Sequence, residues 1–347
     1  MNKKKIVIFD ASLEKVGHGN YYNKSLKYAF NLHGCDVKLY EYYRGKKIYH
    51  HLSLFFKLIG NRKTKFIIFP TPRFFDYFFS YILSFIFFKK KFYVFIRRLE
   101  QNTLKKRIKN CFYRCIYRRE NIFLLVDNSN IAQELGLVAK SFTLPIPPPS
   151  INMENFSESE LIKNFLINKK ISYGFLGRLN SEKGSFHIQK LIEIILKTND
   201  SGVFVQLAAD EKDANAIEII NNIVCSYKNN SRVHMHFGHL KQLEYDTVLK
   251  YCDVGVTPYN VQAYGMGSSG VAAEFIMSGK LVLSSKIKWL SEHPIFKQYC
   301  IFFDPMDVED TAMAVSKVTK LKGLGGNRHK YSDDWLNAIK VLLDGRS

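Results

Sequence analysis

An arginine and a lysine stand five positions apart in a short segment that lies between a predicted strand and a predicted helix. The segment reads GRLNSEKG at positions 177–184, between Ile171–Leu176 and Ser185–Leu196. In open parallel sheets, ligands bind at the carboxyl ends of strands, where this segment is expected. A guanidinium group offers a fork of donors to phosphate oxygens, and an ammonium group offers a point charge. Arg178 and Lys183 are therefore predicted to stabilise a charged leaving group. The alternative is a pair of solvated cations in a turn.

A second segment, YGMGSSGVAAE at positions 264–274, combines small residues with one glutamate and again lies between a predicted strand and a predicted helix. Its small residues are Gly267, Ser268, Ser269 and Gly270. Such residues let the backbone approach a ligand closely, and a helix N-terminus there favours anions. Glu274 lies one turn further and could bind ribose hydroxyls. The alternatives are an ordinary turn and a surface glutamate.

A third segment, Gly17-His18-Gly19, follows the first predicted strand, Ile6–Asp10. It occupies the position of a nucleotide-binding turn but lacks the full Gly-x-Gly-x-x-Gly spacing. We interpret it as shaping the acceptor or diphosphate side of a cleft. A loop with a solvated histidine is the alternative.

The elements that must position these segments alternate between strand and helix. In the first half, the predicted strands are Ile6–Asp10, Asp36–Tyr42, Phe66–Phe69, Phe92–Ile96, Phe123–Val126 and Ser141–Leu144. In the second half, they are Ile171–Leu176, Val203–Ala208, Val233–Phe237, Val254–Thr257, Leu281–Ser284 and Ile301–Phe303. This alternation predicts an α/β protein with two Rossmann-like, doubly wound parallel sheets.

A proline-rich segment at positions 144–149, LPIPPP, separates the two halves and cannot continue a helix or a central strand. We therefore predict an N-terminal domain over residues 1–149 and a C-terminal domain over residues 150–328. Residues 329–347 are predicted to form a final amphipathic helix. A surface loop within one domain is the alternative for the proline-rich segment.

Nearly all of the net positive charge lies in the first half. Residues 1–150 carry 28 lysines and arginines against 9 acidic residues, whereas the remainder carries 23 against 22. The stretch Lys89–Arg119 holds twelve of these cations and one acid, and it follows the aromatic stretch Phe74–Phe88. Cations beside aromatic residues predict contact with an anionic membrane surface. The alternatives are aromatic residues that fill the domain core and a nucleic-acid-binding function, although no recognition module is recognisable.

The six cysteines show no paired framework, and no cluster with the spacing of a zinc site is recognisable in the sequence. Reduced thiols and the lack of a recognisable secretory signal predict a cytoplasmic protein.

The second half resembles glycosyltransferase family 4, and the two halves together resemble the GT-B glycosyltransferases. The resemblance rests on five segments in the expected order between Ile171 and Phe303: FLGR at 175–178, KG at 183–184, FGHL at 237–240, CDVGVTP at 252–258 and AEFIMSGKLV at 273–282. In the first half, it is limited to the strand–helix rhythm and the early glycine turn.

The resemblance implies a GT-B enzyme that moves a hexosyl or other glycosyl group from a nucleotide-sugar to a saccharide acceptor. Arg178 and Lys183 would neutralise the departing diphosphate, so neither a metal nor a cofactor is implied. Gly177 and the small residues Gly267–Gly270 would contact the donor, Glu274 would hold the ribose, and Leu240 would meet the base through its backbone. The family reaction retains the anomeric configuration. The resemblance also implies that the C-terminal helix over residues 329–347 crosses back to the first domain.

The basic first half indicates where this reaction would take place. We expect a lipid-linked acceptor on the inner face of a bacterial plasma membrane, in the synthesis of a surface polysaccharide such as lipopolysaccharide or capsule. The expected partners are the nucleotide-sugar, this acceptor and the anionic membrane surface, with no nucleic acid. At two places the sequence departs from the family. Met266 stands where the family has a glutamate that seats the donor sugar, and RRLE at 97–100 stands where a histidine near the end of the fourth N-terminal strand is common. A non-catalytic GT-B relic is therefore the alternative.

Overall fold

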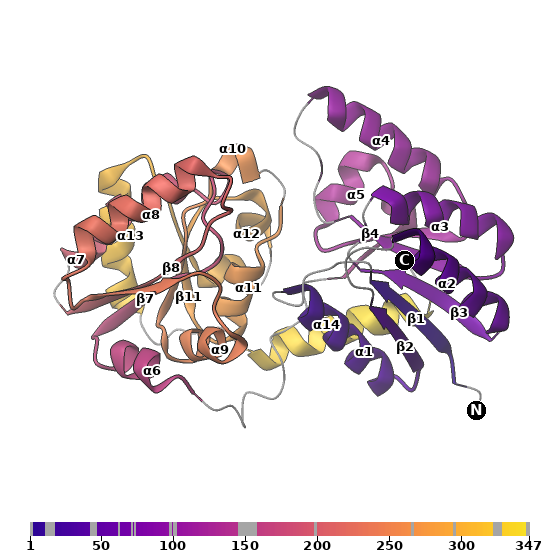
Figure 1. The fold of residues 1–347 in the computed structure, drawn as a ribbon, viewed down its shortest axis with the longest axis horizontal. Helices are drawn as coiled ribbons and strands as arrows, with labels where there is room; N and C mark the ends of the chain where they lie inside the picture. The colour runs from indigo at the N-terminus through magenta and orange to yellow at the C-terminus, as the bar shows by residue number, and fades with distance from the viewer. Residues whose placement is uncertain are drawn as a thin grey trace. The chain divides into compact units, whose positions relative to one another are not determined.

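The computed structural model places the chain in two compact units (Figure 1). The structure describes residues 3–10, 18–41, 47–61, 63–70, 72, 74–96, 99, 103–144, 158–197, 200–264, 267–293, 296–321 and 328–344. The first unit comprises residues 1–147, 266–268 and 332–347, and the second comprises residues 148–265 and 269–331. The predicted boundary at 149–150 lies outside the described residues.

Short apolar strands alternate with helices in the first unit. Its strands are β1 (Lys5–Asp10), β2 (Asp36–Glu41), β3 (Thr64–Phe69), β4 (Lys91–Phe95), β5 (Ile122–Val126) and β6 (Ser141–Thr143). Its helices are α1 (His18–Leu32), α2 (Lys47–Gly60), α3 (Phe74–Ile86), α4 (Thr103–Tyr117), α5 (Ser129–Leu135), the 3₁₀ turn η1 (Val138–Lys140) and most of α14 (Arg328–Asp344).

The six strands form one parallel sheet in the order β2-β1-β3-β4-β5-β6. Strands β1 to β5 present apolar side chains to both faces, as expected for a sheet covered on both sides. Helices α1 and α14 cover one face, where Trp335 and Ile339 of α14 pack with Ile6 and Ile8 of β1. Helices α2, α3, α4 and α5 cover the other face. Figure 1 shows α14 beside α1.

The second unit repeats the same architecture. Its strands are β7 (Ile171–Phe175), β8 (Ser201–Leu207), β9 (Val233–Phe237), β10 (Val254–Thr257), β11 (Leu281–Ser285) and β12 (Cys300–Phe303). Its helices are α6 (Glu160–Ile167), α7 (Ile188–Leu196), α8 (Ala214–Tyr227), α9 (Gln242–Tyr251), α10 (Val261–Tyr264), α11 (Gly270–Met277), α12 (Lys288–Glu292) and α13 (Val308–Leu321), with 3₁₀ turns η3 (Ser185–His187) and η4 (Phe296–Tyr299).

The second sheet has the order β12-β11-β10-β7-β8-β9, again fully parallel. The chain therefore reverses its direction of progress between β7 and β10, which is the doubly wound arrangement. At this point Gly174 of β7 is in register with Gly255 of β10. The ring of Phe275 from α11 lies over both glycines, within about 3 Å of where a Cβ atom on either would stand. The missing side chains thus allow α11 to pack closely on the centre of the sheet.

Two doubly wound parallel sheets confirm the predicted fold class. All twelve predicted strands are present, with ends that differ by at most two residues. None of the helices in the described part of the chain has the length and apolar character needed to cross a membrane.

Candidate active site

The candidate site lies at the carboxyl edge of the second sheet, at the reversal between β7 and β10. The loop after β7 carries residues 176–184, and the segment after β10 carries residues 258–269 and ends at α11. Loops that follow the two strands of such a reversal diverge to opposite faces of the sheet and leave room for a ligand between them. Two of the three segments singled out from the sequence, 177–184 and 264–274, lie in or next to these loops.

Lys183 folds back over the start of its own loop. A Cβ atom on Gly177 would stand 2.8 Å from the Lys183 Nζ, so a side chain at 177 would displace the ammonium group. Gly177 has a φ of +97°, a backbone conformation that side-chain-bearing residues rarely adopt. Its N–H donates to the Gln206 Oε1 at 2.8 Å. The Lys183 N–H donates to the Asn180 Oδ1 at 2.9 Å, which fixes the turn of the loop.

The two loops are joined at Gly184. A Cβ atom on Gly184 would lie 1.7 Å from the carbonyl oxygen of Pro258, and Gly184 has a φ of +67°. The Asn260 N–H also donates to the Glu182 carbonyl at 3.0 Å. The loop after β7 therefore packs backbone to backbone against the loop after β10, an arrangement that only glycine at 184 permits.

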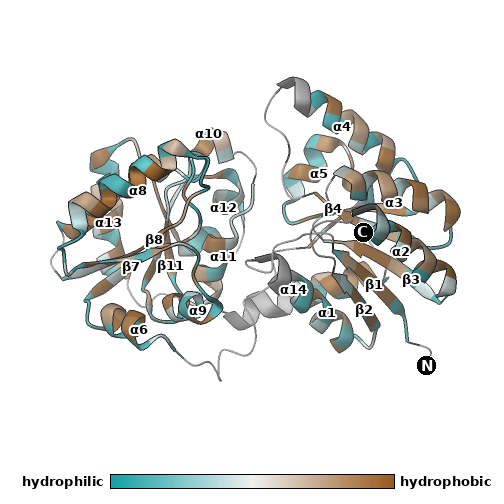
Figure 2. Ribbon diagram, in the orientation of Figure 1, coloured by the Kyte–Doolittle hydropathy of each residue, from teal (hydrophilic) through white to brown (hydrophobic). Residues whose placement is uncertain are grey.

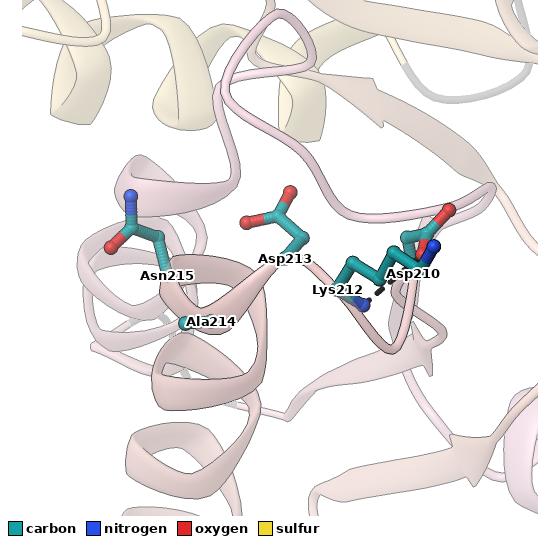
Figure 3. Close-up of a pocket in the computed structure, with 5 residues that line it drawn as sticks. All are labelled: Asp210, Lys212, Asp213, Ala214 and Asn215. Carbon is teal, nitrogen blue, oxygen red and sulfur yellow. Dashed lines mark hydrogen bonds between the residues drawn. The ribbon is translucent and has the colours of Figure 1, made fainter.

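Arg178 points toward the loop after β8. Its Nη1 lies 3.7 Å from the Asp210 Oδ2, and the two side chains are 42% and 56% exposed. An exposed pair of this kind contributes little and exchanges easily with other anions. Asp210 also lines a pocket of about 480 Å³ together with Lys212 and Asp213. Figure 3 shows these side chains at the loop after β8. With two carboxylates in its lining, this pocket is unsuited to phosphate, so Arg178 would have to leave Asp210 to meet a diphosphate.

Tyrosines hold the glycine-rich turn at the start of α11. The Ser269 hydroxyl accepts a hydrogen bond from the Ala272 N–H at 3.0 Å and so caps the helix. The Tyr259 hydroxyl lies 2.6 Å from the same oxygen, and the Tyr259 ring stacks on Tyr264 with centroids 4.2 Å apart. The Ser269 side chain is therefore used to hold the turn. The backbone N–H groups of Ser269 and Gly270 are the donors that this turn can present to an anion.

Glu274 is buried one turn into α11, where it accepts a hydrogen bond from the Tyr245 hydroxyl. Burial and the nearby carboxylate of Glu274 raise the pKa of Tyr245 well above its ordinary value, so the hydroxyl stays a donor. Burial also raises the pKa of Asp246, opposed by its hydrogen bond from Gln242, with Glu274 adding to the rise. The Glu274 carboxylate is thus buried and oriented by a hydrogen bond, and it is not a solvated surface group.

Gln206 is a residue that the sequence analysis missed. It is buried, and its amide joins two loops, accepting from the Gly177 N–H and donating to the Gly238 carbonyl at 3.0 Å. Leu240 is also buried and lies two residues beyond Gly238, in the loop after β9. The sequence did contain a signal, since Gln206 is the one polar residue in the apolar run VFVQL at 203–207. A polar side chain buried in a strand needs hydrogen-bond partners, so Gln206 could have been expected to hold neighbouring loops.

The remaining predicted site residues do not all lie in the second unit. Ser268 belongs to the first unit, where its hydroxyl donates to the Asp127 carboxylate. Gly267 precedes it and is buried. Gly17 and Met266 lie outside the described residues, and α1 begins at His18 and Gly19, whose side chains are also not described. Within the described ranges, no three His, Cys, Asp or Glu side chains gather as metal ligands would.

Comparison with solved structures shows that the fold is that of the GT-B glycosyltransferases. Sucrose-phosphate synthase from Thermosynechococcus elongatus is 13% identical, with a TM-score of 0.69, 99% of this chain covered and 98% of the other. A glycosyltransferase from Rickettsia africae is 11% identical, with a TM-score of 0.69 and the same coverage. The Anabaena protein HepE, solved with UDP and glucose, is 12% identical, with a TM-score of 0.68 and 98% of each chain covered. No family model and no curated protein matches the sequence.

Proposed function

We propose that this protein is a glycosyltransferase that moves a sugar from a nucleotide-sugar donor to a saccharide acceptor. The observation that carries the proposal is the pair of loops that follow β7 and β10. In the first loop, the Lys183 ammonium group lies over Gly177. The second loop leads to the N-terminus of α11 at the same edge of the sheet. The likeness to GT-B structures over nearly the whole chain supports it.

The chemistry follows from the charges at this edge. When the bond between the sugar and the nucleotide breaks, negative charge grows on the diphosphate. Lys183 supplies a positive charge near Gly177, at the start of its loop. Arg178 supplies two parallel N–H donors to phosphate oxygens once its guanidinium group leaves the ion pair with Asp210. The backbone N–H groups of Ser269 and Gly270 add donors without a change of conformation. Glu274, oriented by Tyr245, accepts from the ribose hydroxyls.

The proposed donor is a UDP-sugar. HepE was solved with UDP and with UDP-glucose, and the E. coli trehalose-6-phosphate protein with UDP-2-fluoro glucose. Those ligands belong to the neighbours, and their shared uridine diphosphate is the reason to test this donor first. We also propose that the reaction retains the anomeric configuration, as the family resemblance implies.

The proposed acceptor is a lipid-linked saccharide at the inner face of a bacterial plasma membrane, for a surface polysaccharide such as lipopolysaccharide or capsule. The support is the concentration of 28 basic residues in the first 150 positions. An acceptor that carries a lipid diphosphate, within a membrane of anionic lipids, would be attracted by this charge.

Nucleotide release from a panel of nucleotide-sugars tests the proposal. We expect Arg178→Ala and Lys183→Ala each to lower the rate by about 100-fold or more, the usual effect of removing one group that stabilises developing charge. Lys190→Ala is the matched control, because Lys190 is an exposed lysine of α7 paired with Glu193. Equal rates in the wild type and both site variants, with donor still bound, would instead support a non-catalytic relic.

A further inference from the structure

Two neighbouring helices of the first unit expose apolar side chains with the same spacing. On α2 these are Tyr49, Leu52, Phe56 and Ile59, and on α3 they are Phe75, Phe78, Ile82 and Phe85. Steps of three, four and three residues place each set on one side of its helix. The opposite sides pack in the core through Leu54 and Leu58 of α2 and through Tyr77 and Leu83 of α3. The exposed apolar side chains of α2 and α3 therefore do not contribute to the core of the first unit.

The two helices are held side by side. The His51 Nε2 of α2 lies 2.7 Å from the Asp76 Oδ1 of α3, and both side chains are buried. The His51 ring also packs on Phe79, with centroids 4.6 Å apart, and Phe55 packs on Phe87 at 6.0 Å. Figure 2 shows hydrophobic residues along both helices. The two exposed sets consequently form one surface, which we call the α2–α3 apolar face.

Cations border this face. Lys57 follows Phe56, Lys89 follows Phe88, and all four of these side chains are exposed. Of the described residues from 47 to 121, the acidic ones are Asp76, which is buried against His51, and Glu120. An apolar surface with a basic border matches the interface of an anionic bilayer, where acyl chains lie beneath phosphate groups.

A cavity of about 570 Å³ adjoins the face at the end of α3. Its lining includes Tyr81 and Phe88 from the α3 side and Arg118, Arg119 and Glu120 from the segment after α4. The Arg119 guanidinium lies 3.9 Å over the ring of Phe85, which belongs to the apolar face. Its Nη2 donates to the Ser84 carbonyl at 3.5 Å, and its Nε has no acceptor among the described residues. A buried N–H without an acceptor is costly, and an anionic ligand would supply one.

We propose that the α2–α3 apolar face and this cavity dock the protein on an anionic phospholipid bilayer. The aromatic side chains enter the acyl boundary, and Arg118 and Arg119 bind the phosphate of a lipid headgroup. A second copy of the chain is a poorer occupant, because it would bring two strongly basic units together. The inference rests on the proposed function for its purpose, since docking would bring the enzyme to a membrane-borne acceptor, but its test needs no donor or acceptor.

The test is co-sedimentation of the full chain with vesicles of phosphatidylcholine containing about one third phosphatidylglycerol, at two salt concentrations. Wild type should bind these vesicles, less so at high salt, and bind pure phosphatidylcholine at least about tenfold more weakly. The variant Phe56→Gln/Phe78→Gln should lose most binding, whereas Leu161→Gln/Met313→Gln, two exposed apolar residues of the second unit, should bind as wild type does. Thermal denaturation of each variant checks that it is folded.

A charge-reversal pair tests the basic part. Lys89→Glu/Arg118→Glu should weaken binding to anionic vesicles at least about tenfold, since each lost cation contributes on the order of a fivefold change. Lys317→Glu/Lys320→Glu on α13 makes the same change of charge in the second unit and should have a much smaller effect. Equal binding by the Phe56/Phe78 variant and wild type would overturn the proposal. So would a dimer in light scattering that this variant converts to monomer. Nucleotide release by wild type, measured without vesicles, judges the proposed function separately.

Discussion

The carbonyl oxygen of Pro258 occupies the space where a side chain on Gly184 would begin. This relationship joins the loop that carries Lys183 to the loop that leads to α11, so the geometry of both halves of the candidate site depends on one glycine. Because the neighbouring atom belongs to the backbone, it cannot move aside as the end of a flexible side chain can.

The first prediction is that Gly184→Ala disrupts this junction. The Cβ atom would collide with the Pro258 oxygen at 1.7 Å, and alanine is also strained at a φ of +67°. We expect a loss of stability of more than about 2 kcal/mol, together with loss of the thermal shift on adding UDP. Gly136→Ala is the matched control, because Gly136 has the same φ of +67° and no atom near its Cβ position. A similar effect of both substitutions would show that strain, and not the loop junction, is responsible.

The second prediction concerns the centre of the second sheet. Gly255→Ala would place a Cβ atom 2.3 Å from the ring of Phe275, and overpacking of this kind costs about 1–3 kcal/mol. We expect Phe275→Leu to recover part of that loss in the double variant, because the ring is the group in collision. Chemical denaturation of the four proteins gives the coupling energy. Additive losses would contradict the contact.

Comparison of sequence and structure shows why some features were predictable. Alternating apolar runs such as Val233–Phe237 and Val254–Thr257 marked strands that the structure places at the same residues. Helix α2 was not predicted, because its apolar residues lie on both sides of the helix and obscure its period. Gln206 bonds to Gly177, and Tyr245 bonds to Glu274, each 29 residues away in the chain, and spacing along the sequence does not reveal such pairs.

The third prediction is that Tyr245→Phe weakens donor binding. The substitution keeps the ring but removes the hydroxyl that donates to Glu274. Without this donor, Glu274 loses its fixed orientation, and we expect the affinity for UDP to fall by about tenfold in calorimetric titration, as for the loss of one hydrogen bond to a charged group. Tyr227→Phe, whose hydroxyl donates to the Gln189 carbonyl at 3.2 Å, is the matched control and should bind as wild type does. Unchanged affinity in Tyr245→Phe would show that Glu274 needs no such support.

The fourth prediction is a loss of stability on mild acidification. Burial lowers the pKa of His293 to about 4, whereas an unfolded histidine titrates near 6.5. Between these values the unfolded chain binds a proton that the folded chain does not, so the free energy of unfolding decreases as the pH falls from about 6.5 to about 4, by up to about 3 kcal/mol.

The variant His293→Phe separates this histidine from the others. It preserves the stacking on Phe296, whose ring lies 4.0 Å away, but removes the titration. Its free energy of unfolding should therefore depend less on pH across that window. A residual slope is expected, because burial also lowers the pKa values of His187 and His234. An identical pH profile for the variant and wild type would show that His293 is accessible to protons in the folded chain.

The fifth prediction concerns the C-terminal helix. Trp335 is 2% exposed and packs with β1 and α1 of the first unit, far from it in the sequence. The His33 Nε2 lies 3.1 Å from the Leu336 carbonyl, and the Lys4 Nζ donates to the Leu343 carbonyl at 2.9 Å, so α14 is also held by polar contacts. Trp335→Ala should cost about 3–5 kcal/mol, the usual cost of emptying so large a core site. Val341→Ala, on the exposed side of the same helix, should change stability by less than about 0.5 kcal/mol. Equal effects would mean that α14 is not part of the core of the first unit, since only a core helix distinguishes its two sides.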